Sequence, residues 1–370
     1  MSTEKGWIDY LDDKFDVYVD AVSEAIFRYK YIFAIIGILI NIFHLAILSK
    51  KQMRTTAINC ILIGIALCDM YNMVYRVYDK FYLYIPYDEC NAPYSYTRVV
   101  LSVIGDVFHY VLRFESAFLA VLMASIRVLV VKNPLNSKFD KLSTPKFAIQ
   151  LMFILLIFSS IGDVFYYGRA NIISDGYPVT PPAYCGYPEN YTQIVWWVNV
   201  PVFIYGDLDL QILNMFSGVA TLIPASTLPV LSVLLIKEVR NAAKARKNFL
   251  TSQQSLDKAK ANHLTMMLSI MTTASMIAEG PLGLVKIVKS FQENQLGPSN
   301  VLDHLIEILT YLPILNTYTH CIVSLAVSSQ YQNTVLEVFP CIKAFQKKPQ
   351  VIIVEPSSNQ GTRGSFNSRA

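Results

Sequence analysis

The sequence predicts an all-α membrane protein, a bundle of seven transmembrane helices. Seven long apolar stretches separated by polar loops run through the 370 residues. Most approach or exceed the ~20 residues that a helix needs to cross ~30 Å of hydrocarbon. Hydrophobic residues make up 53% of the chain, and its mean hydropathy is +0.38. The stretches are too long and too continuously apolar for the strands of a membrane barrel.

The whole chain reads as one domain with short extensions. The expected spans, in chain order, are 31–48, 57–77, 99–131, 147–165, 210–236, 264–284 and 305–327. Residues 1–29 are polar and rich in acids, and we expect an N-terminal arm there that is solvated and disordered. The polar residues 346–370 predict a disordered tail, so the seven-helix domain occupies 30–328.

The distribution of basic residues predicts the orientation in the membrane. Lys and Arg are frequent in the loops after spans one, three and five and sparse in the other loops. The positive-inside rule then places the N-terminus outside and the C-terminus inside, with the plasma membrane as the expected location. The sequon at Asn190 falls in a loop that this topology makes extracellular, so Asn190 is a candidate glycosylation site.

Three cysteines lie where chemistry is expected. Cys90 and Cys185 occupy the two long outer loops, in an oxidising compartment, and we expect a disulfide between them. The alternative is two thiols that are unpaired or paired differently. Cys341 follows the last span closely and is either palmitoylated or an unmodified thiol. The outer loop 168–209, rich in proline and aromatic residues, is expected to form a lid or β-hairpin over a pocket.

Several function classes fit the sequence poorly. The formal charge of +4 is too modest to suggest nucleic acid as a partner. A transporter usually shows internal repeats or matching broken helices, which the two halves lack, and a retinal protein would need a lysine in the last span. Only five histidines occur, without metal-ligand spacing at the membrane surface, so we expect neither an enzyme nor a cofactor.

Polar residues recur inside the spans at characteristic spacings. Asn59 and Asp69 are ten residues apart in span two, and Arg127 at the end of span three precedes Pro134 by seven. This spacing resembles that of the rhodopsin-like G-protein-coupled receptors. The positions that match are Gly37, Asn41, Asn59, Asp69, Ser116, Arg127, Pro134 and Asn316.

Departures from that pattern point to a narrower resemblance. Glu279-Gly280-Pro281 stands in place of Cys-Trp-x-Pro, His320 replaces the seventh-span asparagine, and Ile126 replaces the acid before Arg127. Together with Ser328-Ser329-Gln330-Tyr331, these residues resemble the nematode serpentine receptor class W over roughly 33–345. That class is similar to the FMRFamide-type neuropeptide receptors. The resemblance implies a short amphipathic eighth helix, expected over 329–345.

The resemblance also implies a function. The chain is expected to pass a signal from an extracellular ligand to a heterotrimeric G protein, with arrestin as a further partner. A neuropeptide-like ligand is the first hypothesis and a small environmental molecule, sensed by a chemoreceptor, is the alternative. A membrane transporter is the remote alternative, and the clustering of charges in the outer half argues against it.

Candidate site residues fall into three groups. Ionisable residues inside a membrane are costly and usually functional, and those in the outer half are the candidate ligand contacts: Arg76, Asp106, His109, Arg113, Glu279 and Lys286. Arg113 is the expected partner of Glu279, either as a structural pair or with one member holding a charged ligand. Arg127 and Pro134 are expected at the G-protein surface, although Arg127 could instead simply snorkel to the headgroups.

The third group surrounds Asp69 in the middle of span two. Ser116, Asn316 and His320 are expected near it as an activation pocket. Their oxygen-bearing side chains could hold a sodium ion or a cluster of water. The alternative is a structural aspartate that is hydrogen-bonded without an ion, since Glu279 and His320 alter the floor of the pocket.

Overall fold

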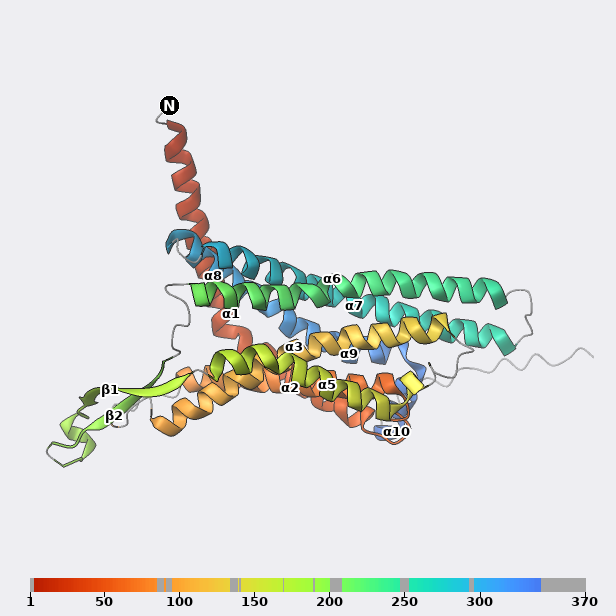
Figure 1. The fold of residues 1–370 in the computed structure, drawn as a ribbon, viewed down its shortest axis with the longest axis horizontal. Helices are drawn as coiled ribbons and strands as arrows, with labels where there is room; N and C mark the ends of the chain where they lie inside the picture. Colours follow the sequence, from red (N-terminus) through yellow and green to blue (C-terminus); the bar gives the residue numbers. More distant parts are fainter. Residues whose placement is uncertain are drawn as a thin grey trace, which may run out of the picture.

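Long helices run side by side along the long axis of the molecule, and a small sheet extends from one end (Figure 1). The structure, a computed structural model, describes residues 3–84, 90, 95–133, 139, 141–168, 170–188, 190–199, 208–246, 253–292 and 296–340. The helices are α1 (Thr3–Leu48), α2 (Ala57–Tyr84), α3 (Tyr96–Lys132), α5 (Pro145–Tyr167), α6 (Leu208–Arg246), α7 (Gln253–Gln292), α8 (Leu296–Leu309), α9 (Tyr311–Val327) and α10 (Ser329–Val338).

Most of the expected spans coincide with helices that could cross a membrane. Within the described part of the chain, six segments are long and apolar enough: Val17–Leu48, Ala57–Tyr78, Tyr96–Lys132, Pro145–Val164, Gln211–Asn241 and Val301–Val327. The expected span 264–284 lies inside α7, which is long enough but is not among the six. Glu279 and Lys286 interrupt its apolar run, although α7 packs along α6 and α9 within the bundle.

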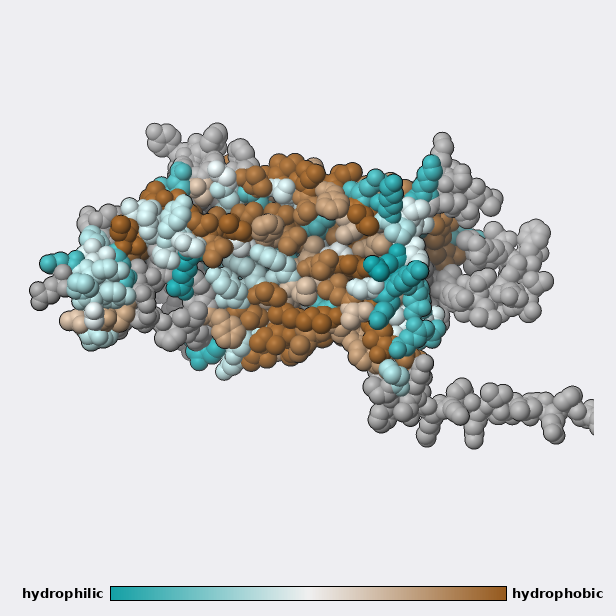
Figure 2. Space-filling view, turned by 90° about the horizontal axis from the view of Figure 1, so that it is seen from below, coloured by the Kyte–Doolittle hydropathy of each residue, from teal (hydrophilic) through white to brown (hydrophobic). Residues whose placement is uncertain are grey.

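The surface of the bundle is suited to lipid. Phe153, Ile157 and Phe158 on α5 are 64%, 67% and 65% exposed, which would be costly in water. Figure 2 shows apolar side chains across the middle of one face, with hydrophilic residues gathered towards the ends. Such a band of apolar surface is what a helical bundle presents to hydrocarbon.

Small residues allow two of the long helices to approach closely. A Cβ atom added at Gly218 on α6 would lie 3.0 Å from the carbonyl oxygen of Gly283 on α7, and one added at Gly283 would lie 3.1 Å from that of Gly218. Backbone contact of this kind is how helices associate in a membrane, where lipid is as apolar as leucine. Any larger residue at either position would push α6 and α7 apart.

One expectation for the ends of the bundle is wrong. The acidic arm was expected to be disordered, but it is helical. Helix α1 begins at Thr3 and not near residue 31. Its first turns project from the end that carries the sheet (Figure 1). The last expected span, 305–327, lies within the candidate membrane segment Val301–Val327, and inside that segment α8 ends at Leu309 and α9 begins at Tyr311. Pro313 has no N–H to donate to the carbonyl of Leu309, which accounts for the break.

The outer loop, for which a lid or a β-hairpin was expected, forms a β-hairpin. Strands β1 (Asn171–Val179) and β2 (Gln193–Asn199) pair antiparallel, with Asn171 opposite Asn199 and an irregularity between Ser174 and Pro178. Short 3-10 turns lie at Ala183–Cys185 and, on the opposite side of the bundle, at Lys141–Ser143. The hairpin contacts the start of α3 and projects beyond the helices (Figure 1).

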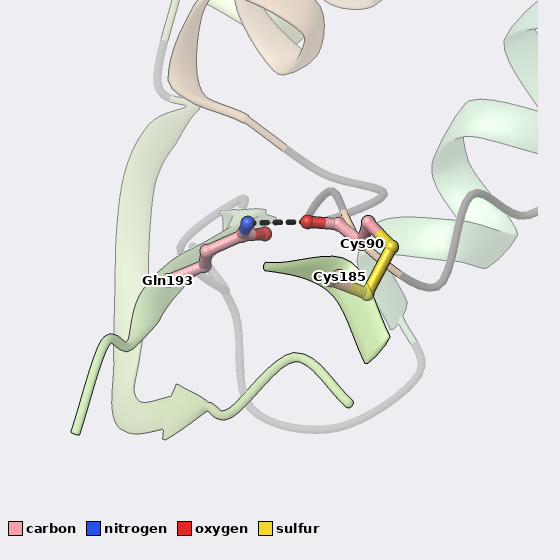
Figure 3. The surroundings of a disulfide bond; sticks show 3 residues. All are labelled: Cys90, Cys185 and Gln193. Carbon is pink, nitrogen blue, oxygen red and sulfur yellow. Dashed lines mark hydrogen bonds between the residues drawn. A yellow bond between two sulfur atoms is a disulfide. The ribbon is translucent and has the colours of Figure 1, made fainter. Parts of the chain in front are cut away.

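A disulfide fastens the hairpin to the helices. It joins Cys90 to Cys185 with their Cα atoms 5.3 Å apart, and Gln193 Nε2 donates a hydrogen bond of 2.7 Å to the Cys90 carbonyl (Figure 3). Asn190 is exposed in the turn of this hairpin, in a left-handed conformation with φ of 73°.

Helix α10 begins where the eighth helix was expected. Ser328 caps it by accepting a hydrogen bond from the Tyr331 N–H. The Tyr331 side chain is 1% exposed, and its hydroxyl lies 2.9 Å from His44 Nδ1 of α1. The described helix ends at Val338, and Cys341 and the tail 346–370 lie outside the described residues.

Candidate functional site

A cavity of about 290 Å³ lies in the outer half of the bundle, among α2, α3, α5, α6, α7 and α8. Four of the predicted ligand contacts line it, namely Arg76, His109, Arg113 and Lys286. Its volume is just below the ~300–1,000 Å³ usual for small-molecule pockets. Further charged lining residues, which the sequence analysis missed as a group, are Asp163, Lys289, Asp303 and Glu307.

Asp163 illustrates what the sequence analysis overlooked. It stands near the end of an expected span, so the cost of placing an acid there was a signal of function. The expected span 147–165 was identified from its apolar residues, and its one acidic residue was not considered as a site residue. Described residues of the β1–β2 hairpin do not line the cavity, so the expected lid is not seen there.

Two other predicted ligand contacts lie elsewhere. The Tyr75 hydroxyl donates a hydrogen bond to Asp106, which keeps that carboxylate between α2 and α3 rather than in the outer cavity. Glu279 lies deeper and pairs with Arg113, with Nη2 and Oε2 3.1 Å apart. The two side chains are 14% and 17% exposed, and the pair that the sequence predicted joins α3 to α7.

Charged contacts connect the helices around the cavity. Lys30 Nζ on α1 lies 2.7 Å from Glu307 Oε1 on α8, and Lys289 on α7 pairs with Asp303 on α8. Lys286 Nζ donates a hydrogen bond of 2.8 Å to Ser217 Oγ on α6. The outer ends of α1, α6, α7 and α8 are therefore held by polar contacts, which weaken if a ligand competes for them.

A second, deeper cavity of about 60 Å³ brings together all four residues of the predicted activation pocket. Ser116 Oγ donates a hydrogen bond of 2.8 Å to Asp69 Oδ1. Asn316 Nδ2 instead donates to Ser275 Oγ, at 3.2 Å, so it does not satisfy the aspartate. His320 completes the lining from α9.

The deeper cavity is suited to water or to a small cation. Its volume would hold a few water molecules, since each needs about 10–15 Å³ by this measure. Carboxylate, hydroxyl and amide oxygens line it, and hard cations prefer such ligands. Asn72, which was not predicted from the sequence, adds a buried Oδ1 that has no hydrogen-bond partner within the described part of the chain. The donor set fits an alkali cation at Asp69 and fits ordered water equally well.

Arg127 lines a third cavity, of about 420 Å³, at the inner end. Polar lining residues there include Asn59, Ser143 and Ser324. Within the described residues, no hydrogen bond or ion pair of Arg127 is seen, in keeping with the absence of an acid at Ile126. Pro134, the other predicted coupling residue, lies outside the described residues.

These features define a class: a helical membrane protein with a polar cavity in its outer half and an arginine-lined cavity at its inner end. The family model described as "Serpentine type 7TM GPCR chemoreceptor Srw" matches residues 28–342. The chain therefore belongs to this family of receptors, as the sequence motifs indicated. A search of curated proteins found no match. The similarity to FMRFamide-type receptors stays a prediction.

Proposed function

We propose that the chain is a plasma-membrane chemoreceptor that binds a small extracellular ligand in the outer cavity and activates a heterotrimeric G protein. The N-terminus is outside and all seven expected spans cross the membrane, with α7 as the sixth. The observation that carries the proposal is the outer cavity itself, about 290 Å³ in volume and lined by Arg76, His109, Arg113 and Lys286. A cavity of this size takes a small molecule whole.

The signal passes inward through contacts that link the cavities. Arg113 lines both the outer and the deeper cavity, and its partner Glu279 belongs to α7. A ligand that contacts Arg113 therefore alters the restraint on α7. The deeper cavity around Asp69 holds water or sodium and changes with that movement. Arg127 then meets the G protein at the inner end, and arrestin binds the same surface later.

A neuropeptide-like ligand is the second candidate, and the hairpin favours it. Tyr184 is 72% exposed and Ile194 is 54% exposed, and the rings of Tyr187 and Tyr191 stack 4.3 Å apart. Aromatic surface of this kind is typical of protein and peptide recognition. A peptide would extend from the cavity to the hairpin, whereas a small molecule would not.

A ligand screen with a G-protein readout tests both candidates. Peptides and small molecules are applied side by side to cells that express the receptor. The variant Tyr184→Ser, which removes exposed aromatic surface of the hairpin, should leave the response to a small ligand unchanged and reduce the response to a peptide. A ligand-evoked current that persists in cells without G proteins would instead indicate a transporter or channel.

A further inference from the structure

Among the residues that the structure describes, three buried polar atoms without hydrogen-bond partners belong to residues that line the outer cavity. They are Arg76 Nε, His109 Nδ1 and Asp163 Oδ2. Leaving such an atom without a partner is costly, so buried polar groups are nearly always bonded. Arg76 and His109 also line the deeper cavity, whereas Asp163 lines the outer one only. The meeting of all three at the outer cavity, from α2, α3 and α5, indicates a ligand there that offers both hydrogen-bond acceptors and a donor.

The charges around the cavity indicate the sign of the ligand. Three of the basic residues already have acidic partners: Arg113 with Glu279, Lys30 with Glu307 and Lys289 with Asp303. Among the described charged residues that line the cavity, this leaves Arg76, Lys286 and Asp163 outside any ion pair, with Glu279 and Glu307 acting on Arg76, and Glu279 on Lys286, only at longer range. Two positive charges against one negative charge leave an excess of +1. A buried charge needs a counter-charge, so the excess favours an anion.

The chemistry of Arg76 narrows the kind of anion. A guanidinium presents a planar fork of N–H donors, which matches the two oxygens of a carboxylate. Its Nε is the very atom that has no partner in the described structure. Asp163 Oδ2, as a carboxylate oxygen, accepts a hydrogen bond from a hydroxyl or an ammonium group of the ligand.

We infer that the ligand is a small organic acid that carries a hydroxyl or amino group. Its carboxylate binds Arg76, with Lys286 adding a second positive charge, and its donor group bonds to Asp163. This inference rests on the proposed role of the outer cavity as the ligand site. It goes beyond that role by assigning a chemical class to the ligand, and by assigning one contact to its carboxylate and another to its donor group.

Binding to the purified full-length receptor tests the inference directly. Thermal unfolding is followed with a panel of small hydroxy acids and amino acids, each beside its methyl ester and its deoxy or deamino analogue. A ligand that binds only the folded state raises the unfolding temperature by an amount that grows with the logarithm of its concentration over Kd, so relative affinities can be read from the concentration dependence. At least one acid should stabilise the receptor, and its ester should bind at least about tenfold more weakly, since the ester loses a charged hydrogen bond.

Three variants locate the two contacts. Arg76→Gln should lose at least about tenfold in affinity for the acid, and Arg76→Lys should retain part of it. Asp163→Asn should weaken binding of the acid but not of its deoxy or deamino analogue. The matched control is Arg28→Gln, because Arg28 is 58% exposed and pairs with Glu24 on the surface of α1, away from the cavity.

Several results would overturn the inference. These are equal stabilisation by acids and esters, unchanged affinity in Arg76→Gln, or no stabilisation by any acid of the panel. The proposed function fails in a different way: an acid that binds through Arg76 yet evokes no G-protein response refutes the receptor role and leaves the ligand class intact. A G-protein response to neutral compounds alone keeps the receptor role and overturns the ligand class.

Discussion

Arg113 on α3 and Glu279 on α7 form an ion pair at the boundary between the outer and the deeper cavity, with Nη2 3.1 Å from Oε2. In the rhodopsin-like pattern that the sequence resembles, a tryptophan stands at the position of Glu279, so the ion pair takes the place of an aromatic side chain. An aromatic ring restrains its neighbours by packing. An ion pair depends on both of its members, so its contribution to stability can be measured with two single substitutions and the double substitution.

Breaking the pair from either side should destabilise the receptor. Glu279→Gln leaves Arg113 without its counter-charge, and Arg113→Gln does the same to Glu279, each in a poorly hydrated site. We expect each single variant to lower the unfolding temperature. The double variant should lose less than the sum, with a coupling of about 0.5–3 kcal/mol. Additive losses in thermal unfolding would show that the two side chains do not stabilise one another.

Cys90 and Cys185 should behave as one functional unit, because they share a disulfide. Cys90→Ser and Cys185→Ser each open the same bond, so each should reduce surface expression or ligand response, and the double variant should be no worse than either. A disulfide typically contributes about 2–4 kcal/mol. Gln193→Ala removes only the hydrogen bond to the Cys90 carbonyl and should cause a smaller loss. Greater loss in the double serine variant would mean that the two cysteines are not partners.

Tyr331→Phe should weaken the contact between α10 and the bundle. The hydroxyl lies 2.9 Å from His44 Nδ1 and 3.7 Å from Cys321 Sγ, and His44 is 0% exposed. Its removal leaves a buried imidazole unsatisfied, at a cost of about 1–3 kcal/mol. Burial raises the pKa of Tyr331, so the hydroxyl stays protonated and the loss should not depend on pH in the physiological range.

Tyr29→Phe is the matched control for that experiment, since Tyr29 is 52% exposed. It removes the same hydroxyl group from the same kind of side chain on the surface of α1. Equal unfolding temperatures for the two variants would contradict a stabilising role for the Tyr331 hydroxyl.

The orientation of the chain is open to a direct test. An epitope tag before Met1 should be stained on intact cells, and one after Ala370 should be stained only after permeabilisation. Asn190 is exposed in the hairpin turn, so a glycosidase should shift the wild-type band and not that of Asn190→Gln. Surface staining of the C-terminal tag would reverse the topology that the basic loops predict.

Much of the fold follows from the sequence because a membrane imposes long apolar helices. The expected span 147–165 lies within α5, Pro145–Tyr167, with only two residues' difference at each end. The pair of Arg113 and Glu279 could also be predicted, because a buried charge needs a partner. These inferences need only local pattern and the cost of exposing charge to lipid.

Contacts between distant segments account for what could not be predicted. The arm before residue 30 has no apolar pattern, and its helix is joined to α8 by Ser23 with His304, 2.9 Å apart, and by Lys30 with Glu307. These partners are more than 270 residues apart in the chain, and nothing in the local sequence pairs them. The grouping of Asp163 with Arg76 and His109 likewise depends on how α2, α3 and α5 pack.

Arg127 should be the residue that passes the signal to the G protein. It lines the inner cavity, far along α3 from the outer one, and no acid among the described residues holds it. We expect Arg127→Ala to keep surface expression and ligand binding and to lose most G-protein activation. Because the arginine lacks an acidic lock, the wild-type receptor should also show measurable basal activity. Normal signalling by Arg127→Ala would contradict this role and would indicate that Arg127 only snorkels to the headgroups.

An acidic partner for Arg127 can be introduced at a position where the structure tolerates a charge. In the rhodopsin-like pattern that the sequence resembles, an acid stands at the position of Ile126. This side chain is 2% exposed within the apolar core, and an aspartate there would be buried at high cost. Ser143 is exposed and lines the same cavity as Arg127. Ser143→Asp should therefore attract the arginine without disturbing the core and lower basal activity, while Ser143→Asn, of similar size and no charge, should not. Equal basal activity in the two variants, at equal surface expression, would show that the arginine's freedom does not set the resting signal.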